Sequence, residues 1–314
     1  MNLRIGSRGS QLALWQANHI AALLRDAGHT VEIEIIKTTG DRLQEVTFAQ
    51  VGSKGMFTKE IEEALAEGRV DLAVHSLKDL PTELPEGFAL AATPKRVDAR
   101  DVLVSAKYAN LAALPQGAVV GTSSQRRRAQ LKALRPDIEA VEFRGNVDTR
   151  LRKLGEGQVD AILLAAAGLD RLEKTEWIRE RMDPKQFCPA AGQGALGIET
   201  RNDDSKTIAA LAFLDHEPTR FAVRTERAAL AALGGGCQVP IGVHCRMEHE
   251  RVQLVEVFGV VADPETGRAI RVQETAPRQH CDAETLGRLV ARKLLESGAL
   301  ALLHQESPIP ASGD

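Results

Sequence analysis

Short β-branched runs alternate with helix-like segments through the first two-thirds of the chain, and this alternation constrains the fold more than any other feature. Residues 3–5 precede a turn and a helical apolar pattern over 11–27, and residues 118–120 precede a similar pattern that begins at Gln125. Further strand-like runs lie at 30–37, 70–74, 138–143 and 159–164. Strands that alternate with helices predict α/β lobes with parallel sheets, whose ligands bind at the carboxyl ends of the strands.

The last third of the chain has a different organisation. We expect one helix over 219–233, then a glycine-rich turn, three short strands near 239–244, 251–257 and 268–274, and a final helix that Asp282 caps. These elements predict a small α+β domain. With 314 residues, the chain has room for two or three domains.

The overall composition argues against several classes of protein. Forty basic and forty-three acidic residues give a net charge of −3, and aromatic residues make up 4%, so a nucleic-acid-binding protein is disfavoured. The first residues lack the blocks of a signal peptide. The longest stretch without charge, 228–245, contains three consecutive glycines and a proline, which is unfavourable for a membrane span. We therefore expect a cytoplasmic protein with no membrane partner.

The four cysteines form no CxxC pair, which is typical of free thiols in a reducing compartment. Cys237, His244 and Cys245 lie near one another in the sequence, but adjacent strand residues point to opposite faces of a sheet. Their spacing also matches no zinc pattern. We expect no metal site.

Positive charge at the start of a predicted helix is the sharpest local signal. Residues 121–153 hold nine Lys/Arg and four Asp/Glu, a net +5, which leaves −8 for the rest of the chain. With Ser124 as N-cap, Arg126, Arg127 and Arg128 fall in the first turn, where each cation costs about 0.3–1 kcal/mol against the helix dipole. An anion bound at this strand end would offset that cost. The alternative is a solvated basic face.

Other basic residues also follow or flank predicted strand ends. They are Arg8, Lys78, Arg144, Arg150 and Arg171. Their recurrence favours a polyanionic ligand, and the preference for arginine favours carboxylates or phosphates held by paired hydrogen bonds. The sequence contains no P-loop, so an ordinary nucleotide site of that kind is not indicated.

Two further residues suggest chemistry beyond anion binding. Asp79 directly follows Lys78 and would stay ionised among these cations, where it could stabilise a developing cation or accept a proton. The alternative is a surface Lys–Asp pair. Cys237 follows three glycines and precedes Pro240, so its thiol could be a nucleophile or an attachment point on a loop, or an inert buried group. The segment between Thr38 and Phe57 has no periodicity and is either a binding loop or an insertion.

Eight stretches, in this order along nearly the whole chain, carry a family resemblance. They are RIGSRGSQLALWQA (4–17), VGSKGMFTKEIE (51–62), DLAVHSLKDLP (71–81), GTSSQRRRAQL (121–131), FRGNVDTRL (143–151), AAAGLDRL (165–172), PAAGQGALGIE (189–199) and GGGCQVPIG (234–242). Together they resemble the porphobilinogen deaminase, or hydroxymethylbilane synthase, family. Departures such as Gln11, Gln125 and Cys188 remove no charged or thiol position of the pattern.

The resemblance implies a fold of three parts. Two α/β lobes similar to those of periplasmic binding proteins would comprise residues 1–94 with 195–212, and residues 95–194. A small α+β C-terminal domain, residues 213–314, would carry the cofactor cysteine. The family also implies a monomer.

The resemblance further implies a transferase of porphyrin and heme biosynthesis. Such an enzyme joins four porphobilinogen molecules head to tail, with loss of ammonia, into the linear tetrapyrrole hydroxymethylbilane. Its dipyrromethane cofactor would be bound covalently to Cys237 through a thioether. Porphobilinogen carries an acetate and a propionate, so the growing chain is the kind of polyanion that the basic residues predict.

The resemblance assigns roles residue by residue. Asp79 would be catalytic, contacting pyrrole nitrogens and stabilising the cation formed when ammonia leaves. The cofactor would be bound by Cys237, Lys78, Asp79, Thr122, Ser123, Ser124, Arg126, Arg127, Arg144 and Gly145. The substrate would be bound by Arg8, Ser10, Arg144, Arg150 and Arg171. Lys54, Phe57 and Lys59 would flank a loop that is mobile over the cleft in the family.

Two other functions remain open on the residues alone. A non-enzymatic polycarboxylate or oxyanion sensor would explain the arginines equally well, although it would not explain Cys237 or the third domain. A nucleic-acid-binding module would use the basic segment, but the net charge and the scarcity of aromatic residues argue against it.

Overall fold

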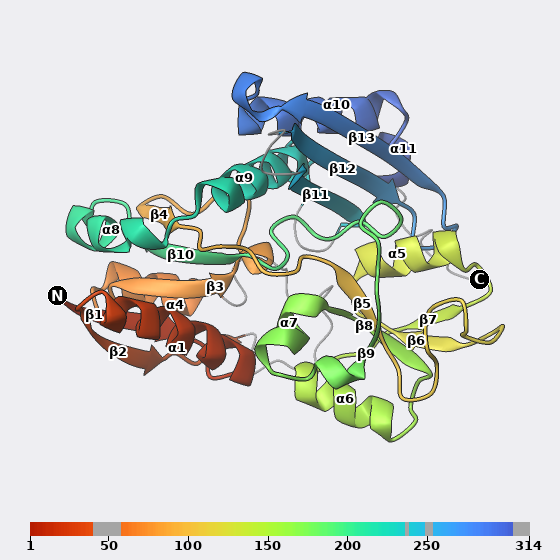
Figure 1. Cartoon of the computed structure of the whole chain (residues 1–314), viewed down its shortest axis with the longest axis horizontal. Helices are drawn as coiled ribbons and strands as arrows, with labels where there is room; N and C mark the ends of the chain where they lie inside the picture. The colour runs from red at the N-terminus through yellow and green to blue at the C-terminus, as the bar shows by residue number, and fades with distance from the viewer. Residues whose placement is uncertain (40–57, 236–238, 249–253, 304–314) are drawn as a thin grey trace, which may run out of the picture.

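The computed structural model describes residues 1–39, 58–235, 239–248 and 254–303, and the statements below concern these residues. They form two α/β lobes and a third part built on a separate sheet (Figure 1). The predicted fold class is confirmed. None of the described helices is both long enough and apolar enough to cross a membrane.

The first lobe is a five-stranded sheet with the order β2-β1-β3-β10-β4. Its elements are β1 (Asn2–Ser7), α1 (Gln11–Asp26), β2 (Thr30–Ile35), α4 (Lys59–Ala66), β3 (Leu72–Ser76), the 3-10 helix η1 (Leu77–Asp79), β4 (Phe88–Ala92), β10 (Leu196–Arg201), α8 (Ser205–Leu211) and η3 (Ala212–Leu214). The apolar stripe of α1, with Ile20 and Leu24 fully buried, packs on Ile5, Leu72 and Ile198 of the sheet. Helical spacing in the sequence therefore translates directly into this core.

The second lobe repeats the same arrangement with the order β7-β6-β8-β5-β9. Its elements are β5 (Asp101–Val104), β6 (Val119–Gly121), α5 (Gln125–Leu134), β7 (Glu139–Val141), α6 (Val147–Gly155), β8 (Ala161–Ala165), α7 (Ala166–Arg171), η2 (Thr175–Trp177) and β9 (Ile178–Arg181). Two segments cross between the lobes, residues 93–100 and residues 182–195. We call them the first and second crossing segments.

The expectation of parallel sheets is correct for only part of each lobe. β1 runs parallel to β2 and β3, and β6 runs parallel to β7 and β8. The fourth strand of each sheet, β10 or β5, is antiparallel to both of its neighbours. Each of these two strands follows a crossing segment, so the chain enters the sheet at the end where the neighbouring strands finish. This is a long-range feature, which the local alternation of strands and helices does not reveal.

The third part is an antiparallel sheet, β11-β12-β13, covered by helices. Its elements are α9 (Glu217–Ala232), β11 (Ile241–Glu248), β12 (Leu254–Ala262), β13 (Ala269–Pro277), η4 (Arg278–His280), α10 (Ala283–Glu296) and α11 (Leu300–Leu303). The predicted cap is confirmed, since the Asp282 side chain accepts a hydrogen bond from the Thr285 amide. The core joins Ala229 of α9, Val257 of β12 and Val290 of α10. β10 and α8 lie with the first lobe, and the exact domain limits remain predictions.

Candidate functional site

Three turns at the carboxyl ends of parallel strands shape the site, and each ends in a helix N-cap. Ser10 accepts from the Ala13 amide at the start of α1, and Ser124 accepts from the Arg127 amide at the start of α5. Asn146 does the same for α6. A capping side chain satisfies amide groups that have no partner within the helix, so these short polar residues determine where each helix begins. Arg8 and Arg144 are thereby placed on the turns, and Arg126, Arg127 and Arg150 in the first turns of the helices that follow.

Gly145 precedes one of these caps and is required by geometry. Its φ is +124°, a region that side chains rarely adopt, and a Cβ there would lie 2.7 Å from a methyl carbon of Thr149. The turn between β7 and α6 is therefore compact. Arg144 and Arg150 lie on its two sides, and the Arg144 Nε donates to Glu142 at 2.5 Å.

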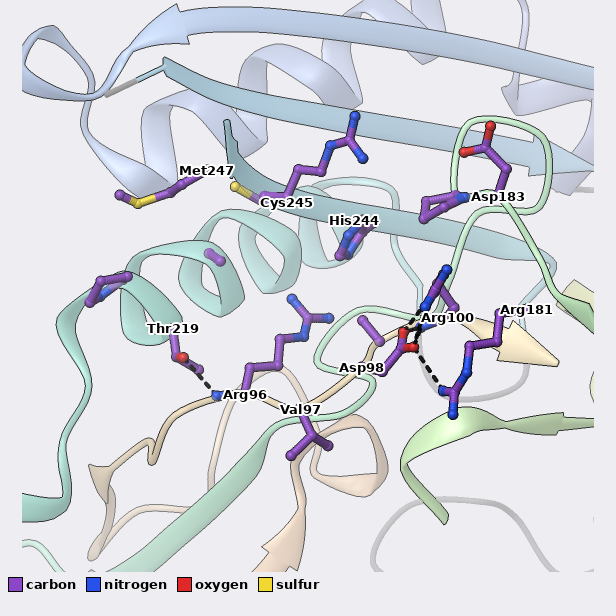
Figure 2. A pocket seen from close by; sticks show the side chains of 15 residues that line it. Arg96, Val97, Asp98, Arg100, Arg181, Asp183, Thr219, His244, Cys245 and Met247 are labelled. Carbon is purple, nitrogen blue, oxygen red and sulfur yellow. Dashed lines mark hydrogen bonds and ion pairs between the residues drawn. The ribbon is translucent and has the colours of Figure 1, made fainter. Parts of the chain in front are cut away.

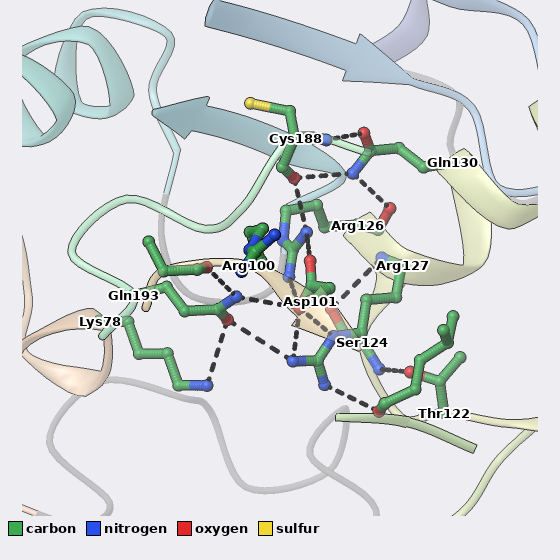
Figure 3. Close-up of polar contacts among 12 residues, drawn as sticks. Lys78, Arg100, Asp101, Thr122, Ser124, Arg126, Arg127, Gln130, Cys188 and Gln193 are labelled. Atoms are coloured by element: carbon green, nitrogen blue, oxygen red, sulfur yellow. Dashed lines mark hydrogen bonds and ion pairs between the residues drawn. The ribbon is translucent and has the colours of Figure 1, made fainter. Parts of the chain in front are cut away.

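Arg126 and Arg127 are buried, so the alternative of a solvated basic face is wrong for these two residues. They are 4% and 6% exposed, and both point at Asp101, which is fully buried (Figure 3). Arg126 donates to the carboxylate at 2.6 and 3.2 Å, and Arg127 donates through Nε at 2.8 Å. Burial alone would raise the pKa of Asp101, but the two guanidinium groups hold it well below its usual range.

The antiparallel strand β5 explains the position of Asp101. The residue pairs with Ala165 at the carboxyl end of β8, so the first residue of β5 lies at the edge where the parallel strands end. One carboxylate pairs with two cations there, which leaves one net positive charge. Arg126 also donates to the Cys188 carbonyl oxygen at 2.6 Å, and Arg127 to that of Leu163 at 3.1 Å.

A cavity of about 110 Å³ lies between the lobes beside Arg127. Its wall contains four cations and apolar or small residues, and none of its described lining residues is acidic. The lining residues are Leu12, Ser76, Lys78, Arg127, Val147, Arg150, Leu164, Ala165, Ala167, Gly168, Arg171, Gly194 and Ala195. We call this the cation cavity. It joins residues of α1 and η1 in the first lobe to residues of α5, α6 and α7 in the second.

The electrostatics of the cation cavity point to an anionic ligand. Removal from water lowers the pKa of Arg150 and of Arg171 to about 10 each, and that of Lys78 to about 8. Within the described part of the chain, the Nε atoms of Arg150 and Arg171 are buried and have no hydrogen-bond partner. Buried donors without acceptors are costly, so a ligand that supplies carboxylate oxygens would satisfy them. Arg171 is further held by the Gly194 carbonyl at 2.9 Å and by the Trp15 ring.

The structure brings some predicted site residues together and not others. Lys78, Arg127, Arg150 and Arg171 line the cation cavity, whereas Arg126 turns away toward Asp101 and Cys188. Other predicted residues lie outside its wall, Asp79 on η1 and the rest on the turns between strands and helices. These are Arg8, Ser10, Asp79, Thr122, Ser123, Ser124, Arg144 and Gly145.

Some of these predicted residues already form hydrogen bonds within the protein, and others are exposed to solvent. Asp79 is exposed, while the Ser123 hydroxyl donates to the Phe143 carbonyl at 2.8 Å. The Thr122 hydroxyl accepts from the Ser124 amide. Lys59 is the exposed first residue of α4. Cys237, Lys54 and Phe57 lie outside the described residues.

Sequence reasoning missed two residues of the site, Asp101 and Gln193. Both are fully buried and both contact Arg127. Asp101 begins a strand that was not predicted, and Gln193 lies in the second crossing segment within PAAGQGALGIE. That stretch belongs to the family resemblance, and the signal available in the sequence was a glutamine between two glycines.

A second cavity, of about 550 Å³, lies at the junction of the first crossing segment with α9 and β11 (Figure 2). It also contains arginines, but these have acidic partners. Arg96 binds Glu226 at 2.6 and 3.2 Å, and Arg181 binds Asp98 at 2.8 Å. Burial alone would raise the pKa of Glu226, but Arg96 and His244 lower it. These arginines therefore differ from Arg150 and Arg171 of the cation cavity, whose Nε atoms have no acceptor among the described residues. In the second cavity the buried His244 Nδ1 makes no hydrogen bond but lies 3.4 Å from Glu226.

The fold and the cation cavity define a class, a two-lobed α/β protein with a cavity lined by cations between its lobes and a third part built on a separate sheet. Family models identify the family. Residues 3–209 match the dipyrromethane cofactor binding domain of porphobilinogen deaminase, and residues 220–296 match its C-terminal domain. The chain belongs to the porphobilinogen deaminase family.

Curated relatives agree over nearly the full length. The chain is 51% identical to a porphobilinogen deaminase of Nitratidesulfovibrio vulgaris, with 97% of this chain and 96% of the relative covered. It is 50% identical to one of Trichlorobacter lovleyi, with 96% and 95% covered. Among solved structures, an arginine-specific periplasmic binding protein of Salmonella typhimurium is 14% identical and covers 70% of this chain and 93% of its own, with a TM-score of 0.37. That value is too low to support an argument about function.

Proposed function

We propose that the cation cavity is where this chain binds the carboxylates of its substrate and of its dipyrromethane cofactor. As a member of its family, the chain polymerises porphobilinogen into hydroxymethylbilane in tetrapyrrole biosynthesis. The observation that carries the proposal is the pair of buried Nε donors of Arg150 and Arg171, which have no acceptor among the described residues. A porphobilinogen ring carries two carboxylates, so each added ring supplies the acceptors that these arginines lack.

The donor set suits the cofactor as well as the substrate. Lys78, Arg127, Arg150 and Arg171 present cations around one small volume with no acidic residue in the described wall. Thr122, Ser123, Ser124, Arg144 and Gly145 lie on the adjoining turns and would add hydrogen bonds, as would Arg8 and Ser10 for the substrate. When bound, the cofactor supplies the covalently held primer to which substrate rings are joined.

Asp79 is the proposed catalytic residue. In each condensation the C–N bond of the porphobilinogen aminomethyl group breaks and ammonia leaves. A C–C bond then forms to the free α-carbon of the terminal ring, which loses a proton. The exposed carboxylate of Asp79, next to Lys78 on η1, would stabilise the positive charge that develops on the substrate ring as ammonia leaves and accept hydrogen bonds from pyrrole N–H groups.

Cys237 is the proposed attachment point, and the other three cysteines support this by contrast. Cys188 and Cys245 are buried, and burial raises the pKa of the Cys188 thiol to about 12. Burial likewise raises the pKa of Cys245 and of the partly exposed Cys281. A thiol that stays protonated is a poor nucleophile, so none of the three is suited to forming a thioether.

The intact mass of the purified protein tests this assignment. We expect a mass above that of the bare chain by two linked pyrrole units, localised by peptide mapping to Cys237. Cys237→Ser should lose both the added mass and turnover, whereas Cys281→Ser, the matched control, should keep both. An unmodified chain that stays unmodified after incubation with porphobilinogen would contradict the proposal and favour a polycarboxylate-binding protein.

We also propose that the chain acts as a cytoplasmic monomer with no nucleic-acid partner. The net charge of −3 and the few aromatic residues support the last point. Light scattering after gel filtration tests the monomer. Binding to DNA or RNA with a steep dependence on salt would contradict the absence of a nucleic-acid partner.

A further inference from the structure

Gln193 joins the cation cavity to the connection between the lobes. It lies in the second crossing segment, is fully buried, and contacts four groups with one amide (Figure 3). Its Nε2 donates to the Ala99 carbonyl at 2.8 Å and to Asp101 at 3.0 Å. Its Oε1 accepts from Lys78 Nζ and from Arg127, each at 3.5 Å.

The orientation of this amide is determined by its partners. Ala99 O and the Asp101 carboxylate can only accept hydrogen bonds, whereas the ammonium and guanidinium groups can only donate them. A rotated amide would place its NH₂ against two cations and its oxygen against two oxygens. The carbonyl oxygen therefore faces the cavity cations, and the NH₂ ties the second crossing segment to Ala99 of the first.

We propose that Gln193 is a positioning residue for the deaminase reaction, whose carbonyl oxygen holds Lys78 of one lobe and Arg127 of the other at a set separation for binding substrate carboxylates. A neutral acceptor is suited to this position. A carboxylate there would cancel the charge that the substrate needs, and an apolar side chain would leave two like charges without an acceptor between them.

The protonation of Lys78 reports on this contact. Burial, Arg127 and Arg126 lower the pKa of Lys78, while Asp79 and Asp101 raise it, and the result is about 8. Loss of the Gln193 oxygen should lower the pKa further. Lys78 would then lose its proton, and with it the ability to bind a carboxylate, at a lower pH.

The test compares Gln193→Met with Gln130→Met in the full-length holoenzyme, after intact mass has shown equal cofactor content. Gln130 is a matched control because it is also fully buried and both ends of its amide form hydrogen bonds. Its Nε2 donates to the Cys188 carbonyl oxygen and its Oε1 accepts from the Cys188 amide, so it contacts the second crossing segment only at Cys188. The kcat and KM for porphobilinogen are measured from pH 6 to 9.

We expect Gln193→Met to lower kcat/KM about tenfold or more, mainly through KM, and to move the basic limb of the pH profile to lower pH by half a unit or more. Gln193→Glu should move that limb to higher pH, because an added carboxylate raises the pKa of Lys78. Gln130→Met should lose thermal stability without moving the limb. Equal pH profiles for Gln193→Met, Gln130→Met and the unaltered enzyme would overturn the inference.

The inference rests on the proposed carboxylate-binding role of Lys78, and Lys78→Gln distinguishes the two. If Lys78→Gln has the KM of the unaltered enzyme, the proposed role of the cation cavity fails. If Lys78→Gln raises KM while Gln193→Met changes neither KM nor the pH profile, only the positioning role of Gln193 fails.

Discussion

Replacement of Asp101 by asparagine tests whether one carboxylate holds the two arginines at the start of α5. Asparagine keeps the size of the side chain but removes its charge. It leaves Arg126 and Arg127, both nearly fully buried, without an anion, and it presents an NH₂ group to guanidinium groups or to Gln193. Removing one partner of a buried ion pair costs about 3–5 kcal/mol, because the remaining charge stays buried and uncompensated.

The matched control is Asp137→Asn. Asp137 binds Arg135 at 2.7 Å within the same lobe, but water screens this partly exposed pair, so the expected cost is much smaller. Thermal and urea unfolding, followed by circular dichroism, measure both variants. We expect the midpoint temperature and the midpoint urea concentration of the first unfolding transition to be clearly lower for Asp101→Asn than for Asp137→Asn.

The pH dependence has a definite sign. The pKa of Asp101 is lower in the folded state than its unfolded value of about 3.9, so the stabilisation is fully present above that value and is lost as pH falls through the folded pKa. The stability difference between the unaltered protein and Asp101→Asn should therefore be constant from pH 8 to 5 and shrink in stronger acid. A cost under about 1 kcal/mol at pH 7, or a difference that grows in acid, would refute the argument.

Three further predictions concern the site and its support. Asp79→Asn should keep the cofactor mass but lower turnover at least a hundredfold, and normal turnover would exclude Asp79 from catalysis. Arg150→Ala should block chain elongation, measured from the masses of enzyme-bound intermediates, without lowering the melting temperature. Arg152→Ala, which changes an exposed arginine on the same helix, should elongate normally, and an equal effect of the two would contradict the cavity assignment. Glu226→Gln should destabilise by about 3–5 kcal/mol because it leaves Arg96, whose side chain is only 10% exposed, without an anion, and calorimetry showing no change would contradict this.

Much of the fold was predictable because its causes are local. The apolar stripe of α1, the caps Ser124 and Asp282, and the turn at Gly145 depend on residues within a few positions of one another. The antiparallel strands β10 and β5 were not predictable in this way. Their pairing joins residues such as Val74 and Ile198, which are remote in sequence, and the crossing segments determine the direction in which each strand enters its sheet.

The sequence by itself determined the family and the positions of the basic residues at strand ends, and it favoured an anionic ligand for them. It did so because strand ends, caps and charge excess are properties of short segments. Only the tertiary structure decided which cations already have an internal anion, since Asp101 pairs with both Arg126 and Arg127 from a strand that arrives from elsewhere in the chain. One net positive charge is left for a ligand. The tertiary structure also decided that the Nε atoms of Arg150 and Arg171 are buried without an acceptor among the described residues, and that Gln193 bonds to Ala99. Burial and hydrogen bonding between remote residues depend on how the lobes pack together.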